Sequence, residues 1–269
     1  MICFPNAKIN LGLSIIEKRS DGMHNIETCF IPIPLYDILE ILPADRFSIE
    51  HFGLPIPDAT SSNLIVRAWN LLLSIKENIQ PVKVCLYKNI PIASGLGGGS
   101  SDAAFFIKEI NKLYALGFTS GDMELLAGKI GADCPFFIKN QVSIAEGTGN
   151  IFTEVENPVS GMFVTVVFPR VQISTKDAFS KLNPKTDSNL TKVLHESSNI
   201  WKNYLRNDFE EIIFKDYPEI HHIKNILYSS GALYSSLTGS GSAIYALSTK
   251  PLDIIGLEKK NIVWSGILD

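Results

Sequence analysis

Several features of membrane, secreted and nucleic-acid-binding proteins are missing from this sequence. No apolar run reaches the roughly 18–20 residues needed to cross a bilayer. The N-terminus, MICFPNAKINLGLSI, lacks the charged segment, apolar stretch and small-residue cleavage site of a signal peptide. The formal net charge is −4, and there is no basic stripe to bind a nucleic-acid backbone. We therefore expect a cytoplasmic protein with no membrane and no nucleic-acid partner.

Cysteine is scarce, and its spacing matches no metal or redox motif. The chain has four cysteines and no CxxC pair. They are Cys3, Cys29, Cys85 and Cys134, and each stands among apolar neighbours. We expect buried, reduced thiols, which fits a reducing compartment.

What remains is the composition of an ordinary globular protein. Of its 269 residues, 45% are apolar and 19% are charged, which allows one large domain or two modest ones. Periodicity predicts strands over 7–16, 28–33, 37–42, 82–87, 162–168 and 242–247, and helices over 61–75, 101–116, 121–130, 174–182, 205–214 and 221–229. The first of these helices has Ser61, Ser62 or Asn63 as its N-cap.

The order of these elements bears on fold class and domain organisation. Strands and helices alternate without a regular βα repeat, which favours an α+β fold over a doubly wound parallel sheet. Residues 154–161 contain Glu, Asn, Pro, Ser and Gly and form the best candidate linker. We predict an N-terminal domain over 1–157 and a C-terminal domain over 158–269.

A glycine-rich run, PIASGLGGGSSDAA at 91–104, separates a predicted strand from a predicted helix. Its glycines are Gly95, Gly97, Gly98 and Gly99. Glycine reaches positive φ without steric cost and lets backbone N–H groups approach a ligand closely. A helix start also leaves N–H groups unpaired and carries a partial positive charge. The run therefore predicts a phosphate site, where Ser100 or Ser101 caps the helix or donates to a phosphate oxygen.

Two better-known phosphate motifs are excluded. A P-loop needs GxxxxGK[ST], but the only Gly-Lys pair, Gly128-Lys129, is followed by Ile130. A dinucleotide fingerprint needs GxGxxG, and Ser100 occupies the place of its third glycine. The alternative to a phosphate site is a flexible glycine turn. Asp102 favours the helix start, and we assign it no catalytic role.

At this run the sequence resembles the GHMP kinase superfamily. PIASGLGGGSSDAA is similar to that family's second motif, AKINLGLSI at 7–15 to its N-terminal motif, and LTGSGSAIYAL at 237–247 to its C-terminal motif. Further stretches, including SDGMHNIET, NLIVRAWNLL, IGADCPFFI, AEGTG and PRVQISTKDAF, follow in the order of one branch. That branch uses ATP to phosphorylate the 2-hydroxyl of a cytidine-diphosphate-linked methylerythritol in the non-mevalonate route to isoprenoids.

The resemblance implies a two-domain α+β fold. Its N-terminal domain would be like domain 2 of ribosomal protein S5, and its C-terminal domain a ferredoxin-like α/β sandwich. The resemblance also implies ATP as co-substrate with Mg²⁺, and a small cytidyl-linked molecule as the other substrate. Nothing in the sequence indicates the metal ligands or the oligomeric state.

The family's catalytic pair matches Lys8 and Asp133. The resemblance implies that Asp133 accepts the proton of the attacking hydroxyl and that Lys8 stabilises the developing alkoxide. Two unit charges about 4 Å apart attract by roughly 4 kcal/mol at an effective dielectric near 20, which also keeps the carboxylate ionised. Judged on composition alone, the two residues would be a strand-edge lysine and a cap aspartate.

Binding residues carry over in the same way. For ATP the resemblance implies the positions Pro91, Ile92, Ala93, Ser94, Gly95, Leu96, Gly97, Gly98, Gly99, Ser100 and Ser101, with Asn63 and Lys88 near the adenine. For the acceptor it implies Asn10 near the reacting end, His24 hydrogen-bonded to cytosine, Phe179 stacked on cytosine and Thr175 one helical turn away. Met23 departs from the family pattern, in which a tyrosine often precedes the histidine.

Some alternatives remain open at this point. The glycine turn at 239–242 either lines the junction of nucleotide and substrate or is only a tight hairpin turn. Another GHMP kinase with a small aliphatic acceptor, such as homoserine or mevalonate, would not need His24 beside Phe179. A non-catalytic nucleotide-binding protein on the same scaffold would be expected to lack Lys8 or Asp133, and this chain has both.

Overall fold

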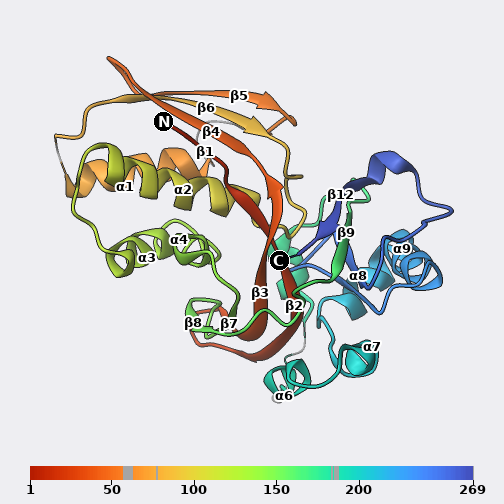
Figure 1. Cartoon of the computed structure of the whole chain (residues 1–269). Helices are drawn as coiled ribbons and strands as arrows, with labels where there is room; N and C mark the ends of the chain where they lie inside the picture. The colour runs from red at the N-terminus through yellow and green to blue at the C-terminus, as the bar shows by residue number, and fades with distance from the viewer. Residues whose placement is uncertain (57–62, 77, 183, 185–187, 269) are drawn as a thin grey trace. The chain divides into compact units, whose positions relative to one another are not determined.

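The computed structural model describes residues 1–56, 63–76, 78–182, 184 and 188–268, and the chain forms two compact units (Figure 1). The first unit consists of Met1–Ala7, Pro34–Ile92 and Gly97–Gln141. The second unit consists of Lys8–Ile33, Ala93–Leu96 and Val142–Asp269. The glycine-rich run therefore contributes to both units. A single domain boundary between residues 157 and 158 stays a prediction.

One layer of the first unit is a four-stranded sheet. Its strands lie in the order β1 (Ile2–Cys3), β4 (Ile38–Pro43), β6 (Val82–Lys88) and β5 (Ser48–Gly53). Neighbouring strands are antiparallel except β5 and β6, which are parallel. Along β6 the buried side chains Val82, Val84 and Leu86 alternate with more exposed ones, as expected for a strand with one covered face.

Helices form the other layer of this unit. The helices α1 (Leu64–Ile75) and α2 (Gly98–Leu113) pack alongside each other, with α3 (Ser120–Gly128) and α4 (Phe136–Lys139) next to α2 (Figure 1). The N-cap of α1 is Asn63, whose side-chain oxygen accepts a hydrogen bond from the backbone N–H of Ile65 at 2.8 Å. The other two cap candidates, Ser61 and Ser62, lie outside the described residues.

The second unit contains two four-stranded sheets. The first has the order β2 (Asn6–Lys18), β3 (His24–Tyr36), β7 (Ser143–Glu146) and β8 (Ile151–Glu154). The second has the order β10 (Tyr234–Leu237), β11 (Ile244–Ser248), β9 (Phe163–Val167) and β12 (Ile262–Ile267). In the second sheet all neighbours are antiparallel, and a ferredoxin-like sheet has this same strand order.

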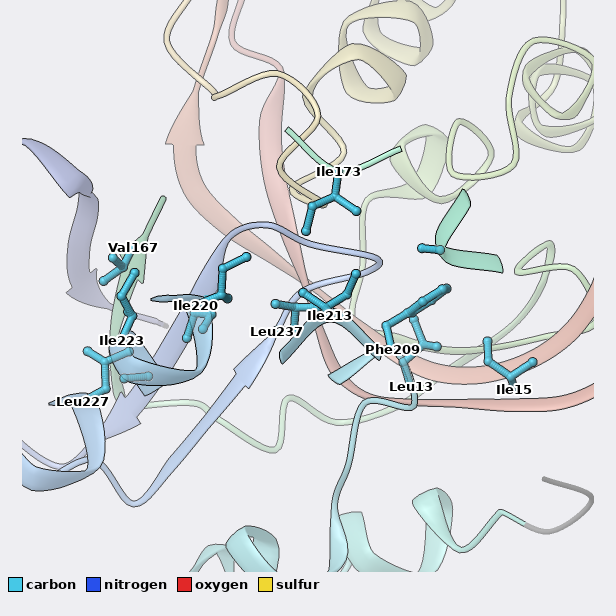
Figure 2. Packing of buried hydrophobic residues seen from close by; sticks show 13 residues of the cluster. Leu13, Ile15, Val167, Ile173, Phe209, Ile213, Ile220, Ile223, Leu227 and Leu237 are labelled. Atoms are coloured by element: carbon cyan, nitrogen blue, oxygen red, sulfur yellow. The ribbon is translucent and has the colours of Figure 1, made fainter. Parts of the chain in front are cut away.

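The helical elements of the second unit lie between β9 and β12 in the sequence. They are α5 (Thr175–Ser180), α6 (Leu190–Leu194), η1 (Ser198–Ile200), α7 (Trp201–Tyr204), α8 (Glu210–Asp216), α9 (Pro218–Ser229) and η2 (Lys259–Asn261). Figure 2 shows the core that α5, α8 and α9 share with the sheets. Leu13 of β2, Phe209, Ile220 of α9 and Leu237 of β10 belong to this one buried cluster.

Most of the predicted elements are confirmed with shifted ends, but two predictions need correction. The helix expected over 205–214 begins only at Glu210. Before it, the backbone pairs with β2 instead: Leu13 N–H donates to Arg206 O, and Asp208 N–H donates to Leu13 O, both at 2.9 Å. The helix expected from residue 101 begins at Gly98, so Ser100 and Ser101 lie inside its first turn and do not cap it.

The structure tests the prediction that the four cysteines are buried, reduced thiols. Cys3, Cys29 and Cys134 are buried as predicted, whereas Cys85 is only half-buried on β6. None of the four forms a disulfide. Burial raises the pKa of each of the three buried thiols to about 12, so they are neutral at physiological pH. Within the described residues, no helix is long and apolar enough to cross a bilayer.

Candidate active site

Within the second unit, three of the sequence motifs meet at the segment Ala93–Leu96. The backbone N–H of Lys8 on β2 donates to Leu96 O at 2.9 Å, and that of Ala243 donates to Ser94 O at 3.0 Å. Gly95 has φ +81°, and a Cβ there would lie 1.9 Å from the backbone oxygen of Thr238. The N-terminal motif, the glycine-rich run and the C-terminal motif are therefore in direct backbone contact.

A buried polar network surrounds this meeting point. The Lys8 ammonium donates to Asn10 Oδ1 at 2.5 Å and lies 4.9 Å from the centroid of the Phe30 ring. Asn10 Oδ1 is also 3.2 Å from the hydroxyl of Thr238, and Asn10 Nδ2 donates to Thr28 Oγ1 at 3.0 Å. Lys8 and Asn10 are 2% and 1% exposed. An amide dipole and an aromatic face thus compensate part of the desolvation of the ammonium.

In the first unit, the run continues as the start of α2. Gly97 is the N-cap, with φ +75°, a conformation that glycine adopts without strain. The first intrahelical bond runs from Ser101 N–H to Gly97 O at 2.9 Å, so the N–H groups of Gly98, Gly99 and Ser100 precede the helical ladder. Among the described residues, the buried Ser101 hydroxyl has no hydrogen-bond partner. This helix start has the features of an anion site.

Lys88, predicted to lie near the adenine, is buried between two carboxylates of the first unit. Its ammonium donates to Asp37 Oδ2 and, at 2.7 Å, to Asp102 Oδ2 on α2. Burial lowers the pKa of Lys88, but the carboxylates of Asp102 and Asp37 outweigh it and hold that pKa above its usual value. Burial raises the pKa of Asp102 to about 8 despite Lys88, and the like charge of Asp37 adds to the rise.

Asp133 stands in a turn of the first unit between α3 and α4. Gly131 N–H donates to Ala127 O, and Cys134 N–H donates to Gly131 O, both at 3.2 Å, so the backbone on either side is fixed. The Cys134 side chain is buried and hydrogen-bonded to Ser100 of the α2 start. Asp133 itself is half-buried. Because Lys8 belongs to the second unit, their action as a catalytic pair stays a prediction.

The two residues predicted to bind cytosine, His24 and Phe179, contact each other in the second unit. The rings of His24 and Phe179 are stacked, with centroids 5.0 Å apart and an angle of 29° between their planes. Phe209 supports Phe179 edge-on at 4.9 Å. Burial lowers the pKa of His24, and the positive charge of Lys18 lowers it further, so the neutral imidazole is favoured. Met23, which precedes His24, is 49% exposed, whereas His24 is buried.

Comparisons with known proteins bear on these motifs. The family described as GHMP kinases N terminal domain matches residues 63–141, and the family GHMP kinases C terminal matches residues 188–256. The chain is 47% identical over 252 residues to the 4-diphosphocytidyl-2-C-methyl-D-erythritol kinase of Bacteroides fragilis, covering 92% of each chain. It is 43% identical over 255 residues to that of Cytophaga hutchinsonii, covering 93% and 94%. The chain belongs to the GHMP kinases.

Solved structures of GHMP kinases resemble this chain as well. A crystal structure of 4-(cytidine 5'-diphospho)-2C-methyl-D-erythritol kinase aligns with a TM-score of 0.78 at 29% identity, covering 92% of this chain and 90% of that one. The mevalonate kinase of Methanococcus jannaschii aligns with a TM-score of 0.65 at 16% identity, with the same coverage. The second likeness shows the fold alone. The α+β fold inferred from the sequence is thereby confirmed.

Sequence reasoning missed Asn207, which organises the second glycine turn of this GHMP kinase. Asn207 Nδ2 donates to Leu237 O at 2.9 Å and to Gly239 O at 2.8 Å, which holds the second glycine turn. Thr175 on α5 is exposed, and its hydroxyl is 3.0 Å from that of Ser240 in this turn. The turn joins the antiparallel strands β10 and β11, so it is a hairpin turn, and its place at the junction of nucleotide and substrate stays a prediction. Asn207 lies within the helix predicted over 205–214, and this helical pattern concealed its role.

Proposed function

We propose that this kinase transfers the γ-phosphate of ATP to the 2-hydroxyl of 4-diphosphocytidyl-2-C-methyl-D-erythritol. The products are the 2-phosphate and ADP, and the step belongs to the non-mevalonate route to isoprenoid precursors. Relatives named for this activity, at 42–47% identity over more than nine-tenths of the chain, support the proposal. The observation that carries it is the stacked pair of His24 and Phe179, which offers an aromatic face and a neutral imidazole edge to a pyrimidine.

In this proposal the two catalytic residues have separate tasks. Asp133 accepts the proton of the 2-hydroxyl as the oxygen attacks phosphorus. Lys8 stabilises negative charge on that oxygen, and Asn10 aims the ammonium because its Oδ1 accepts from Lys8 Nζ. Phosphoryl transfer depends mainly on positioning and charge neutralisation, so these two effects are expected to account for most of the chain's own contribution.

ATP binding is assigned to the glycine-rich run at 91–101. The N–H groups at the start of α2 are proposed to bind phosphate oxygens. Mg²⁺ bound with the nucleotide would neutralise charge on the phosphates. Ser101 offers it a hydroxyl oxygen that is buried and without a partner among the described residues. Asn63 and Lys88 remain proposed neighbours of the adenine, although the ammonium of Lys88 is directed at Asp37 and Asp102.

A coupled assay of ADP release tests the function. With ATP, Mg²⁺ and 4-diphosphocytidyl-2-C-methyl-D-erythritol, the wild type is expected to turn over, and Asp133→Ala is expected to lower kcat by about 10²–10⁴-fold. Asp253→Ala, which removes an exposed carboxylate, is the matched control and is expected to keep wild-type activity. Turnover of homoserine or mevalonate, with none of the cytidyl-linked substrate, would contradict the proposal.

A further inference from the structure

We propose that Thr28 is a positioning residue for phosphoryl transfer: its hydroxyl fixes the amide of Asn10, and that amide fixes the ammonium of Lys8. The inference rests on the proposed function only for the role of Lys8. Thr28 lies on β3, and its hydroxyl is hydrogen-bonded to Gly12 and Asn10.

The hydrogen bonds around Thr28 have one consistent direction. A threonine hydroxyl carries a single proton, and Thr28 donates it to Gly12 O at 2.5 Å. Its lone pairs are therefore left to accept from Asn10 Nδ2 at 3.0 Å. The amide oxygen must then face the other way, where it accepts from Lys8 Nζ at 2.5 Å. The carbonyl of Gly12 thus determines, through two side chains, which end of the amide faces the ammonium.

The reversed amide would be costly here. Turning the Asn10 side chain over would point its NH₂ group at the Lys8 ammonium, so two donors would face each other. Thr28 and Asn10 are 0% and 1% exposed, so bulk water does not replace a lost partner. The backbone of Asn10 is held independently, because Tyr245 Oη donates to Asn10 O at 2.8 Å and Asn10 N–H donates to Thr238 Oγ1 at 3.1 Å. The amide orientation is therefore fixed at the NH₂ end by Thr28 and at the oxygen end by Lys8 and Thr238, so the loss of the Thr28 hydroxyl leaves the NH₂ end without its acceptor.

The hydroxyl is separable from the structural role of the residue. Thr28 pairs with Ala145 in the antiparallel register of β3 and β7, and this pairing uses backbone groups only. Valine is also β-branched and fits the same strand position. Thr28→Val consequently removes one donor and one acceptor while it keeps the shape and the strand. Thr28→Ser keeps the hydroxyl and loses only a methyl group.

Steady-state kinetics of these variants test the inference. Thr28→Val is expected to lower kcat by about 10- to 100-fold and to leave the KM for ATP within about threefold, because charge stabilisation in the transition state is lost. Thr28→Ser is expected to restore most of kcat. Thr165→Val is the matched control, since Thr165 is also a buried strand threonine, hydrogen-bonded to Ser265 at 3.0 Å and outside the site. The inference would be overturned if Thr28→Val kept the wild-type kcat. It would also be overturned if Thr28→Ser had a kcat as low as that of Thr28→Val.

A double-mutant cycle distinguishes positioning from a general weakening of the fold. If Thr28 acts through Asn10, then Asn10→Ala combined with Thr28→Val has the kcat of Asn10→Ala alone. Multiplicative effects would overturn the inference. The side-chain amide resonances of Asn10, assigned by their loss in Asn10→Ala, give a readout that needs no acceptor. They are expected to shift and exchange faster in Thr28→Val but not in Thr165→Val, and unchanged resonances would sink the inference whichever acceptor the kinase uses.

Discussion

At the residue scale, the contact of His24 with Phe179 carries the proposed cytosine site, which a kinase with a small aliphatic acceptor would not need. The two rings are stacked, and Phe209 packs edge-on behind Phe179. We propose that cytosine stacks on Phe179, whose ring Phe209 supports edge-on. The lowered pKa of His24 keeps the imidazole neutral near pH 7, so one ring nitrogen donates and the other accepts.

Truncation of Phe179 tests this assignment. We expect Phe179→Ala to raise the KM for the cytidyl-linked acceptor by about 10-fold, because a stacked aromatic contact is worth on the order of 1 kcal/mol or more. The KM for ATP should change much less. Steady-state kinetics with each substrate varied in turn measures both values.

Phe214→Ala provides the control for that experiment. Phe214 lies in the same unit and stacks on His221 with centroids 4.9 Å apart, so it tests the general cost of losing a ring. We expect it to leave both KM values near wild type. Equal rises in the two KM values for Phe179→Ala would count against a role in cytosine binding.

At the element scale, the glycine-rich run depends on close backbone approach. Gly95 combines a positive φ of +81° with a carbonyl oxygen of Thr238 only 1.9 Å from the place of a Cβ. The obstacle is backbone, so rotation of a side chain cannot relieve the clash. Any residue other than glycine would separate the run from the C-terminal motif.

Gly95→Ala is therefore expected to lower the stability of the second unit and to abolish most kinase activity. Gly161→Ala separates the two causes, because Gly161 has φ +75° but no atom within 4 Å of the added Cβ. The control should lose only about 1 kcal/mol for the left-handed conformation. Thermal unfolding and kcat measure the difference, and equal losses in the two variants would show that φ alone decides.

Elements with strong periodicity could be predicted, and so could residues inside recognised motifs. The strand over 82–87 and the helix at 221–229 have apolar residues at the right spacing, and Lys8 and Asn10 stand in a motif. Thr28 is the last residue of SDGMHNIET, a stretch that resembles the family. Its hydrogen bond with Asn10 forms only when β2 and β3 lie side by side. The segment 205–209 has a helical pattern that β2 overrides by pairing with its backbone. Such long-range pairings leave no local signal.

At the scale of the whole molecule, the free energy of unfolding depends on pH through a buried group of three charges, Lys88, Asp37 and Asp102. Asp37 Oδ1 accepts from the N–H groups of Asn89 and Ile90, while Asp37 Oδ2 and Asp102 Oδ2 share the ammonium. Two carboxylates and one ammonium leave one excess negative charge in the interior. A proton on Asp102 removes that charge, which is the physical sense of its raised pKa.

The sign of the pH dependence follows from the two pKa values of Asp102. The pKa is near 4 in the unfolded chain and about 8 in the folded one, so folding takes up a proton between these values. The contribution of Asp102 to the free energy of unfolding is complete below pH 4 and falls by roughly 1 kcal/mol per pH unit as the pH rises towards 8. Asp102→Asn removes this titration because an amide stays neutral. Urea unfolding at pH 5.5, 6.5 and 7.5 measures the free energy of unfolding, which should change less with pH for Asp102→Asn than for the wild type. Asp253→Asn, at an exposed position, is the control and should show the same pH dependence as the wild type. Parallel profiles for all three proteins would mean that Asp102 is ionised throughout this range and that Lys88 alone balances both carboxylates.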